Sequence, residues 1–271
     1  MKIALPCIAP FCLATIALLC ISLQAHSQIL NIERHRLKAD TSNNFLMNLR
    51  LGMNLNNRSA AEDAPVNLYG FNSALHAIYR SKNHGYILIG QSDYLRINEN
   101  TFLNFGFLHG RVNFFRDRAL NYELFTQASY DNFRGLDPRI IFGGSTRYRF
   151  VETEKSDLIA GLGAFYESEK WRHPATDSFV EVEFIKVSTY LSWRQEIASN
   201  IDFNSVIYYQ SGYDGEISDY RHRVSGNINL NTRITKRLSF NNSFEFGYED
   251  KPIVPITKFI YALRMGMIFA W

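Results

Sequence analysis

The sequence has little cysteine and none beyond residue 20. The three cysteines are Cys7, Cys12 and Cys20. They lie within an apolar run from Ile3 to Leu23, which follows Lys2 and precedes Ala25-His26-Ser27. A basic residue, an apolar segment and a small-x-small motif in this order are typical of a secretory signal peptide. We therefore predict that residues 1–27 are a signal peptide cleaved after Ser27. The mature chain then has no disulfide, and its fold alone must stabilise it.

Two other interpretations of this segment are weaker. The run is long enough for a membrane-spanning helix, but Pro6 and Pro10 interrupt it and a cleavage motif follows directly. Leu19-Cys20 resembles a lipoprotein site, but a bulky leucine stands where the lipoprotein peptidase requires a small residue. Cleavage after Ser27 remains the preferred interpretation.

The mature chain also lacks a second long apolar run and a strong excess of charge. Beyond Leu23 no apolar run approaches eighteen residues, so any membrane insertion of the mature chain is not helical. Removal of Lys2 from the 29 basic residues leaves 28 of them against 26 acidic residues. A nearly neutral chain has no electrostatic footprint for nucleic acid.

What the chain does have is strict alternation, clearest in its last stretch from Phe259 to Trp271. Large apolar or aromatic residues occupy every odd position, and the even positions hold Arg264, Gly266 and smaller groups. Side chains of a strand alternate between two faces, and about ten residues suffice for a tilted transmembrane strand. We predict that Phe269 and Trp271 form an assembly signal for the barrel-insertion machinery, since outer-membrane barrels usually close on such a strand.

The same two-residue period recurs along the whole mature chain after a charged lead-in at residues 28–43. We expect the lead-in to be a solvated periplasmic tail; the alternative is a segment tucked into the barrel mouth. Together with the last stretch, the alternation predicts twelve strands, near residues 45–54, 69–80, 86–94, 102–114, 122–131, 139–150, 158–169, 185–194, 202–210, 223–233, 238–249 and 259–271.

Alternation fits both a soluble β-sandwich and a membrane barrel, and three features favour the barrel. Aromatic residues stand at both ends of apolar faces, as Tyr69 and Tyr79 do, which is typical of interfacial girdles. Long connections tend to alternate with tight ones, and an even strand count puts both ends on one side. We predict an all-β fold: a single antiparallel transmembrane β-barrel of about 12 strands over residues 44–271, in the outer membrane of a Gram-negative cell.

Several short motifs carry a resemblance to a known family. They are Asn31-Ile32-Glu33-x-x-Arg36, Asp40-Thr41, His109-x-Arg111-x-Asn113, Glu123-x-Phe125-x-Gln127, Arg139, Gly143-Gly144, Arg147 and Tyr166-Glu167-x-Glu169. With them the chain resembles domain-of-unknown-function family 481, described as salt-induced outer-membrane proteins, in its Bacteroidetes-type form. The resemblance covers essentially the whole mature chain and implies an outer-membrane barrel with no agreed activity. The stretch Gly110-Arg111-Val112-Asn113 is less aromatic than the family pattern.

Inward-facing charges predict two polar ladders inside the barrel. Centring the turns between strands places Glu123 opposite Arg111 and Arg147, which gives the first ladder. The same procedure places Asp131 and Glu169 on either side of Arg139, which gives the second. Opposite charges across strands stabilise by about 0.2–1 kcal/mol per pair. The ladders either fill and rigidify the lumen or form a charged constriction that selects solutes.

An enzyme or a metal site is not expected. Twelve-stranded barrels include an outer-membrane phospholipase, so a lipid-acting hydrolase is the alternative function. Such an enzyme needs a serine beside a histidine base, but Ser73 and His76 face opposite ways by parity. Asp214, Glu216 and Asp219 supply oxygen ligands of the kind calcium prefers, but their spacing fits no recognised loop.

The expected function is therefore a narrow small-solute channel or a mainly structural envelope protein. The expected partners are outer-membrane lipid, the insertion machinery and small solutes, and no cofactor is expected. Inward positions carry more basic than acidic residues, so an open lumen should slightly favour anions.

Overall fold

A computed structural model describes residues 44–57 and 65–269. Over these residues the chain forms twelve β-strands: β1 (Phe45–Asn57), β2 (Asn67–Arg80), β3 (His84–Ile97), β4 (Asn100–Phe114), β5 (Leu120–Asp131), β6 (Leu136–Glu152), β7 (Ser156–Arg172), β8 (Phe179–Ala198), β9 (Ile201–Asp214), β10 (Asp219–Arg233), β11 (Leu238–Glu249) and β12 (Phe259–Phe269). In this part of the chain, no helix is long and apolar enough to cross a membrane.

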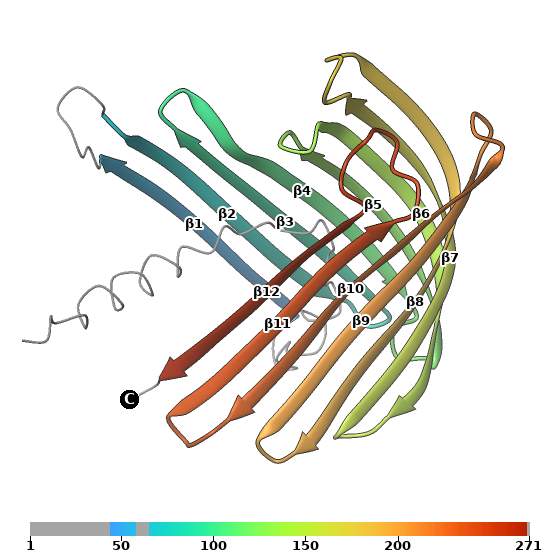
Figure 1. Ribbon diagram of the computed structural model, residues 1–271. Helices are drawn as coiled ribbons and strands as arrows, with labels where there is room; N and C mark the ends of the chain where they lie inside the picture. The colour runs from blue at the N-terminus through green and yellow to red at the C-terminus, as the bar shows by residue number, and fades with distance from the viewer. Residues whose placement is uncertain (1–43, 58–64, 270–271) are drawn as a thin grey trace, which may run out of the picture.

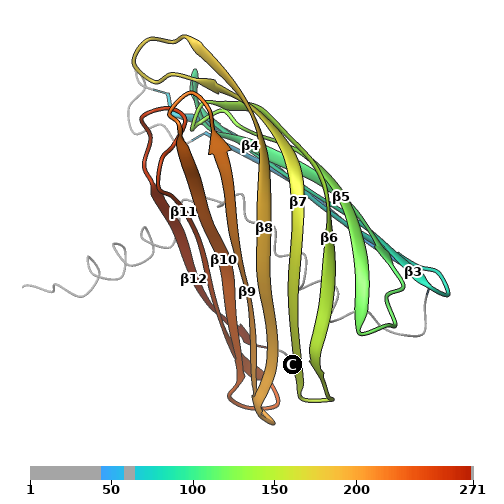
Figure 2. The ribbon, with the colours of Figure 1, turned by 90° about the vertical axis from the view of Figure 1, so that its right-hand side faces the viewer.

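All strands belong to one antiparallel sheet in which each strand pairs with its neighbours in the sequence. This meander confirms the predicted all-β class, the number of strands and their order. The sheet is open along one side, because the edge strands β1 and β12 are not hydrogen-bonded to each other among the described residues. Figures 1 and 2 show the sheet curving so that β3–β6 and β9–β12 face each other across its concave side.

The two faces of the sheet have an inverted distribution of polarity. Large apolar side chains are exposed on the convex face, for example Met53 at 74%, Ile185 at 75% and Met267 at 73%. Charged side chains are buried on the concave face, where Glu123 is 2% exposed and Glu167 fully buried. The alternation along each strand produces this separation, since successive side chains point to opposite faces.

The connections lie at the two ends of the sheet, and the end that carries the C-terminus holds only short ones. These are residues 81–83, 115–119, 153–155, 199–200 and 234–237. The opposite end, called here the upper end, carries the longer connections at 58–66, 173–178 and 250–258. Three connections on the upper end depart from this pattern because they are as short as those of the other end: the tight turn at Asn98 and Glu99 and the four-residue connections at 132–135 and 215–218.

The strand bounds extend the predicted ones mostly outward. The largest extension is at β8, which begins at Phe179 although the clear alternation begins at Ile185. The predicted signal peptide, the lead-in at residues 28–43 and the last residue, Trp271, lie outside the described residues. These predictions therefore stay predictions.

Candidate functional site

The concave face holds a cluster of six buried or half-buried charges, which we call the upper cluster. Its members are Arg139 on β6, Glu167 and Glu169 on β7, Lys186 on β8, Arg223 on β10 and Glu249 on β11. Glu167 contacts Arg139, Lys186 and Arg223, with Oε1 2.9 Å from Nη1 of Arg223. Three basic groups thus face three carboxylates, and the cluster is electrically neutral.

Neighbouring strands and the strand period assemble one half of the upper cluster. Glu167 and Glu169 are two residues apart on β7, so both side chains point to the concave side. Arg139 is the direct cross-strand partner of Glu169, and its Nε lies 3.2 Å from Oε1 of Glu169. The Nε1–H of Trp171, the next residue on this face, donates to Oε2 of Glu169 at 2.8 Å.

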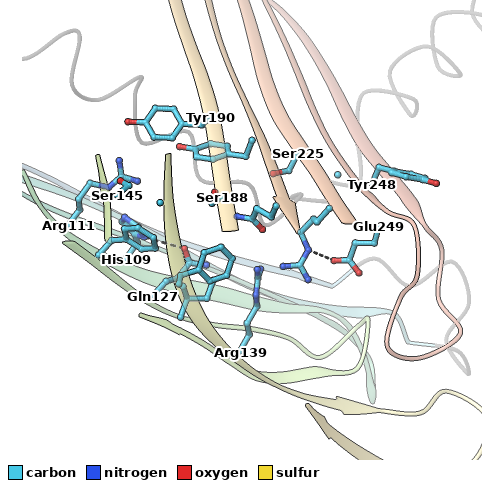
Figure 3. A pocket seen from close by; sticks show the side chains of 18 of the residues that line it. His109, Arg111, Gln127, Arg139, Ser145, Ser188, Tyr190, Ser225, Tyr248 and Glu249 are labelled. Atoms are coloured by element: carbon cyan, nitrogen blue, oxygen red, sulfur yellow. Dashed lines mark hydrogen bonds and ion pairs between the residues drawn. The ribbon is translucent and has the colours of Figure 1, made fainter. Parts of the chain in front are cut away.

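The other half of the upper cluster comes from across the concave side. Arg223 on β10 donates to Glu167 and Glu169 on β7, each at 2.9 Å, although β8 and β9 separate these strands in the sheet. The Nε–H of Arg223 also donates to Glu249 at 2.6 Å, an interaction visible in Figure 3. The cluster therefore braces two walls of the curved sheet and narrows the space between them.

A second group, called here the lower triad, lies nearer the C-terminal end of the sheet. It consists of Glu123 on β5 with Arg111 on β4 and Arg147 on β6. The Glu123 carboxylate lies 3.2 Å from Nη1 of Arg111 and 3.9 Å from Nε of Arg147. The hydroxyl of Tyr190 on β8 donates to it at 3.4 Å. One carboxylate thus serves two guanidinium groups, which leaves the triad with a formal charge of +1.

A cavity of about 140 Å³ on the concave face is lined by members of both groups. The lining includes Arg139, Arg223 and Glu249 of the upper cluster and Arg111 and Glu123 of the lower triad. Figure 3 shows the side chains of His109, Gln127, Ser188 and Tyr190 around the same space. His109 Nδ1 and Gln127 Oε1 are 3.3 Å apart. Polar, cationic and aromatic groups therefore surround one space.

The connection of residues 250–258, called here the β11–β12 loop, packs against the far wall at the upper end. Val254, 2% exposed, contacts Leu136 of β6 and Trp171 of β7 in an apolar cluster. The first residues of the β11–β12 loop are bound to β10. The His222 N–H donates to Asp250 Oδ1 at 2.8 Å, and the Lys251 ammonium binds Asp219. The loop thus joins strands that are distant in the sheet and covers part of the upper end (Figure 1).

The structure brings together all three residues of the first predicted ladder, but with a different register. Glu123 is the direct partner of Asn113 and Ser145, so Arg111 and Arg147 reach it diagonally. Turn centres define register only to within two residues when the turn length is uncertain.

The second predicted ladder is correct in one contact and wrong in the other. Arg139 does pair with Glu169, but Asp131 is the partner of Leu136, and Ser129 lies opposite Arg139. Irregularities between Ser129 and Asp131 and between Leu136 and Arg139 shift the register there. Such a bulge inserts extra residues into one strand. Asp131 accepts instead a hydrogen bond from the backbone N–H of Arg134 at 3.2 Å.

Sequence reasoning did not identify the remaining members of the upper cluster as partners. Glu167, Lys186, Arg223 and Glu249 all stand at predicted inward positions, which the two-residue period shows. Arg223 and Glu249 are direct partners on β10 and β11, and Lys186 lies on the strand beside Glu167. Only the contacts of Arg223 with Glu167 and Glu169 depend on the curvature that brings β7 and β10 together, and no local pattern encodes that curvature. Of the predicted assembly signal, Phe269 is the last residue of β12 and is exposed.

The residues considered for the alternative enzyme and for a calcium site have other arrangements in the structure. Ser73 and His76 lie on opposite faces of β2, because they are three positions apart in one strand. Asp214 pairs with Arg221, and Asp219 pairs with Lys251. In the described part of the chain, no group of three or more histidine, cysteine or acidic side chains is arranged to hold a metal ion.

Comparisons with known proteins place the chain in a family. The profile of "Protein of unknown function, DUF481" matches residues 67–271. No curated protein matches the sequence. Among solved structures, the NanC porin is similar at 12% identity and a TM-score of 0.43, over 74% of this chain and 94% of that one. The TodX monoaromatic hydrocarbon channel is similar at 9% identity and a TM-score of 0.36, over 84% of this chain and 79% of that one. With TM-scores below 0.5, these two similarities do not establish a common fold.

Proposed function

For this chain, which belongs to the DUF481 family, we propose the role of an integral outer-membrane β-barrel with a narrow passage for small solutes. The observation that carries the proposal is the inverted polarity of the sheet, with apolar side chains exposed on one face and charged ones buried on the other. A soluble protein rarely exposes an apolar patch larger than a few hundred Å². Here the exposed apolar positions recur on all twelve described strands, as expected of a face that contacts lipid.

The exposed convex face supports membrane insertion on energetic grounds. Removing a Leu, Ile, Met or Phe side chain from water stabilises by about 1.5–3 kcal/mol. Leu51, Met53 and Leu55 on β1 and Met265 and Met267 on β12 are all more than half exposed. Insertion into hydrocarbon removes these side chains from water without a second protein.

Insertion also requires the sheet to close. The edge strands β1 and β12 present backbone N–H and C=O groups, and each such group left unsatisfied in hydrocarbon costs several kcal/mol. Both strands carry exposed apolar side chains at alternate positions, so both have a lipid-compatible face. We therefore propose that β1 pairs with β12 in the membrane, which abolishes the edges.

The interior supports a narrow passage rather than a wide pore. A barrel of twelve strands is smaller than the porins with sixteen to eighteen. The upper cluster braces opposite walls, and the β11–β12 loop covers part of the upper end. The cavity between the clusters is lined by five basic residues, Arg111, Arg134, Arg139, Arg223 and Lys258, against the acidic Glu123 and Glu249. Conductance should be small, with a weak preference for anions that salt reduces.

Export and assembly complete the proposal. Residues 1–27 act as the cleaved signal, residues 28–43 lie in the periplasm, and Phe269 with Trp271 is part of what the insertion machinery recognises. Mass spectrometry of the membrane-extracted protein should give Gln28 as its first residue. Deleting residues 269–271 should lower the amount in the outer membrane, and an unchanged level of heat-modifiable protein would contradict that role.

Conductance in a planar lipid bilayer tests the passage directly. The purified native protein should give small, slightly anion-selective steps. A folded, membrane-inserted protein without any steps would leave the structural envelope role in its place. A large cation-selective pore would contradict the assignment of the faces.

A further inference from the structure

We propose that the cavity between the upper cluster and the lower triad binds a small organic anion, a carboxylate carried on a compact apolar body. The proposal rests on the function above and names the solute class of the same interior. Its carboxylate contacts Arg134 and Lys258, and its apolar body lies against the aromatic walls.

Arg134 and Lys258 differ from the other cations of the cavity because neither forms an ion pair among the described residues. Arg111, Arg139 and Arg223 each form ion pairs with buried glutamates. Within the described residues, neither the Arg134 guanidinium nor the Lys258 ammonium forms an ion pair, although both line the cavity. Arg134 is half-buried in the β5–β6 turn, where its guanidinium lies 5.9 Å from the ring centre of Trp171.

Arg134 is half-buried, whereas Lys258 is exposed at the rim of the cavity. A half-buried cation loses part of its hydration, so a nearby anion stabilises it. Asp131 and Glu249 attract Arg134 electrostatically, but neither carboxylate forms an ion pair with its guanidinium. An incoming carboxylate would supply the charge-assisted hydrogen bonds that the chain provides for the other arginines.

Two pairs of aromatic rings form the apolar part of the lining. The rings of Phe125 and Phe165 have centres 6.4 Å apart, and those of Tyr190 and Tyr208 have centres 5.3 Å apart. Tyr190 is held in place by Gly161, its cross-strand partner, because a Cβ there would lie 2.0 Å from the ring. All four rings line the cavity, so a bound molecule meets apolar walls as well as charge.

The size of the cavity restricts the ligand further. A volume of about 140 Å³ is close to that of an engineered cavity of about 150 Å³ that holds one benzene molecule. An oligosaccharide is larger than this volume. A single carboxylate on a ring or a short branched chain fits both the volume and the lining.

The test uses the folded full-length mature protein in detergent and benzoate as the probe, with binding measured by titration calorimetry. Benzyl alcohol has the same ring without the charge, and inorganic phosphate has the charge without the ring. Benzoate should bind at least tenfold more tightly than either. Equal affinity for benzyl alcohol would overturn the role of the cations, and equal affinity for phosphate would overturn the role of the rings.

Two variants locate the site. Arg134→Gln and Lys258→Gln should each weaken benzoate binding about tenfold, the effect of losing one charge-assisted hydrogen bond. The matched controls are Arg96→Gln near the end of β3 and Lys155→Gln in the β6–β7 turn, which remove the same charges outside the cavity and should leave binding unchanged. Heat-modifiable mobility on gels confirms that each variant is folded. Unchanged binding in folded Arg134→Gln and Lys258→Gln would overturn the proposal.

The outcome is separable from that of the proposed passage. A protein that binds benzoate but gives no conductance steps would sustain the binding site and contradict the channel. A conducting protein that binds no benzoate would do the reverse.

Discussion

The upper cluster and the lower triad are built from the same residue types but differ in balance and reach. In the upper cluster, three cations meet three carboxylates, and Arg223 crosses from β10 to β7. In the lower triad, one carboxylate serves two arginines on the strands directly beside it. The Tyr190 hydroxyl on β8 reaches the triad from a more distant strand.

This difference separates two tasks of the interior. The upper cluster links walls that are far apart in the sheet, so it stabilises curvature and obstructs the space between them. The lower triad lies along one wall and leaves a surplus positive charge beside the cavity. We therefore expect loss of a carboxylate to affect mainly stability in the upper cluster and both stability and selectivity in the lower triad.

The largest expected effect follows from Glu167→Ala in the upper cluster. The change leaves Arg139, Lys186 and Arg223 without their shared carboxylate, and breaking a buried pair costs about 3–5 kcal/mol. Heat-modifiable mobility should be lost at a clearly lower temperature. The control is Glu152→Ala, whose pair with Arg149 is exposed and contributes less than about 1 kcal/mol. Equal melting temperatures of the two variants would show that the upper cluster does not stabilise the sheet.

A smaller effect is expected from Glu123→Ala in the lower triad. Arg111 and Arg147 lose their carboxylate, and an unsatisfied buried polar group costs about 1–3 kcal/mol. The reversal potential in a salt gradient should move further toward anions, because the formal charge of the triad rises. An unchanged melting temperature would show that the lower triad does not stabilise the protein. A shift of the reversal potential toward cations would contradict the inward orientation of these arginines.

Trp171→Phe sharpens the comparison by detaching the β11–β12 loop from the charges without removing its apolar contact. The indole donates to Glu169 and packs on Val254, and phenylalanine keeps only the packing. A hydrogen bond to a charged group contributes about 1.5–3 kcal/mol, so stability should fall by no more than that. Noisier or larger conductance steps should accompany the loss. Steps identical to those of the native protein would show that this bond does not hold the loop.

The smallest effect is expected outside the clusters, at Asp177 in the β7–β8 connection. The Arg172 guanidinium donates to this exposed carboxylate at 2.8 Å, and this hydrogen bond lowers the pKa of Asp177 below its ordinary value. A lowered pKa means that the pair stabilises only above that ordinary value and is lost as pH falls. Asp177→Asn should therefore melt like the native protein at low pH and at most slightly earlier at neutral pH. A large difference at neutral pH would contradict the contrast between buried and exposed pairs.

The strands were predictable from the sequence because burial on one face imposes a two-residue period on every strand. The same period placed Glu123, Glu167 and Arg223 on the inner face. The contact between Arg223 and Glu167 was not predictable, because it depends on how far the sheet curves. The position of Asp131 was missed because a bulge near Ser129 leaves no signature in the alternation.

The β11–β12 loop illustrates the same limit. Its apolar residues, Ile253, Val254 and Ile256, are visible in the sequence, but an apolar loop has no period that identifies its partner. Only the structure places Val254 against Leu136 and Trp171.

The central claim is that the apolar face meets lipid and the charged face lines an enclosed interior, which requires β1 to pair with β12. Disulfide cross-linking in outer membranes tests this pairing directly. The chain has no cysteine beyond residue 20, so introduced pairs are the only thiols after cleavage of the predicted signal. A disulfide forms only when the two Cα atoms lie within about 7 Å.

Cysteines at Leu49, Leu51 or Met53 are each combined with a cysteine at Leu263 or Met265, which samples the possible registers on the exposed face. The positive control joins Phe244 to Leu263, which are direct partners in β11 and β12. We predict that at least one β1–β12 pair cross-links as completely as the control. Efficient cross-linking of the control with none in any β1–β12 pair would contradict closure and, with it, the enclosed interior.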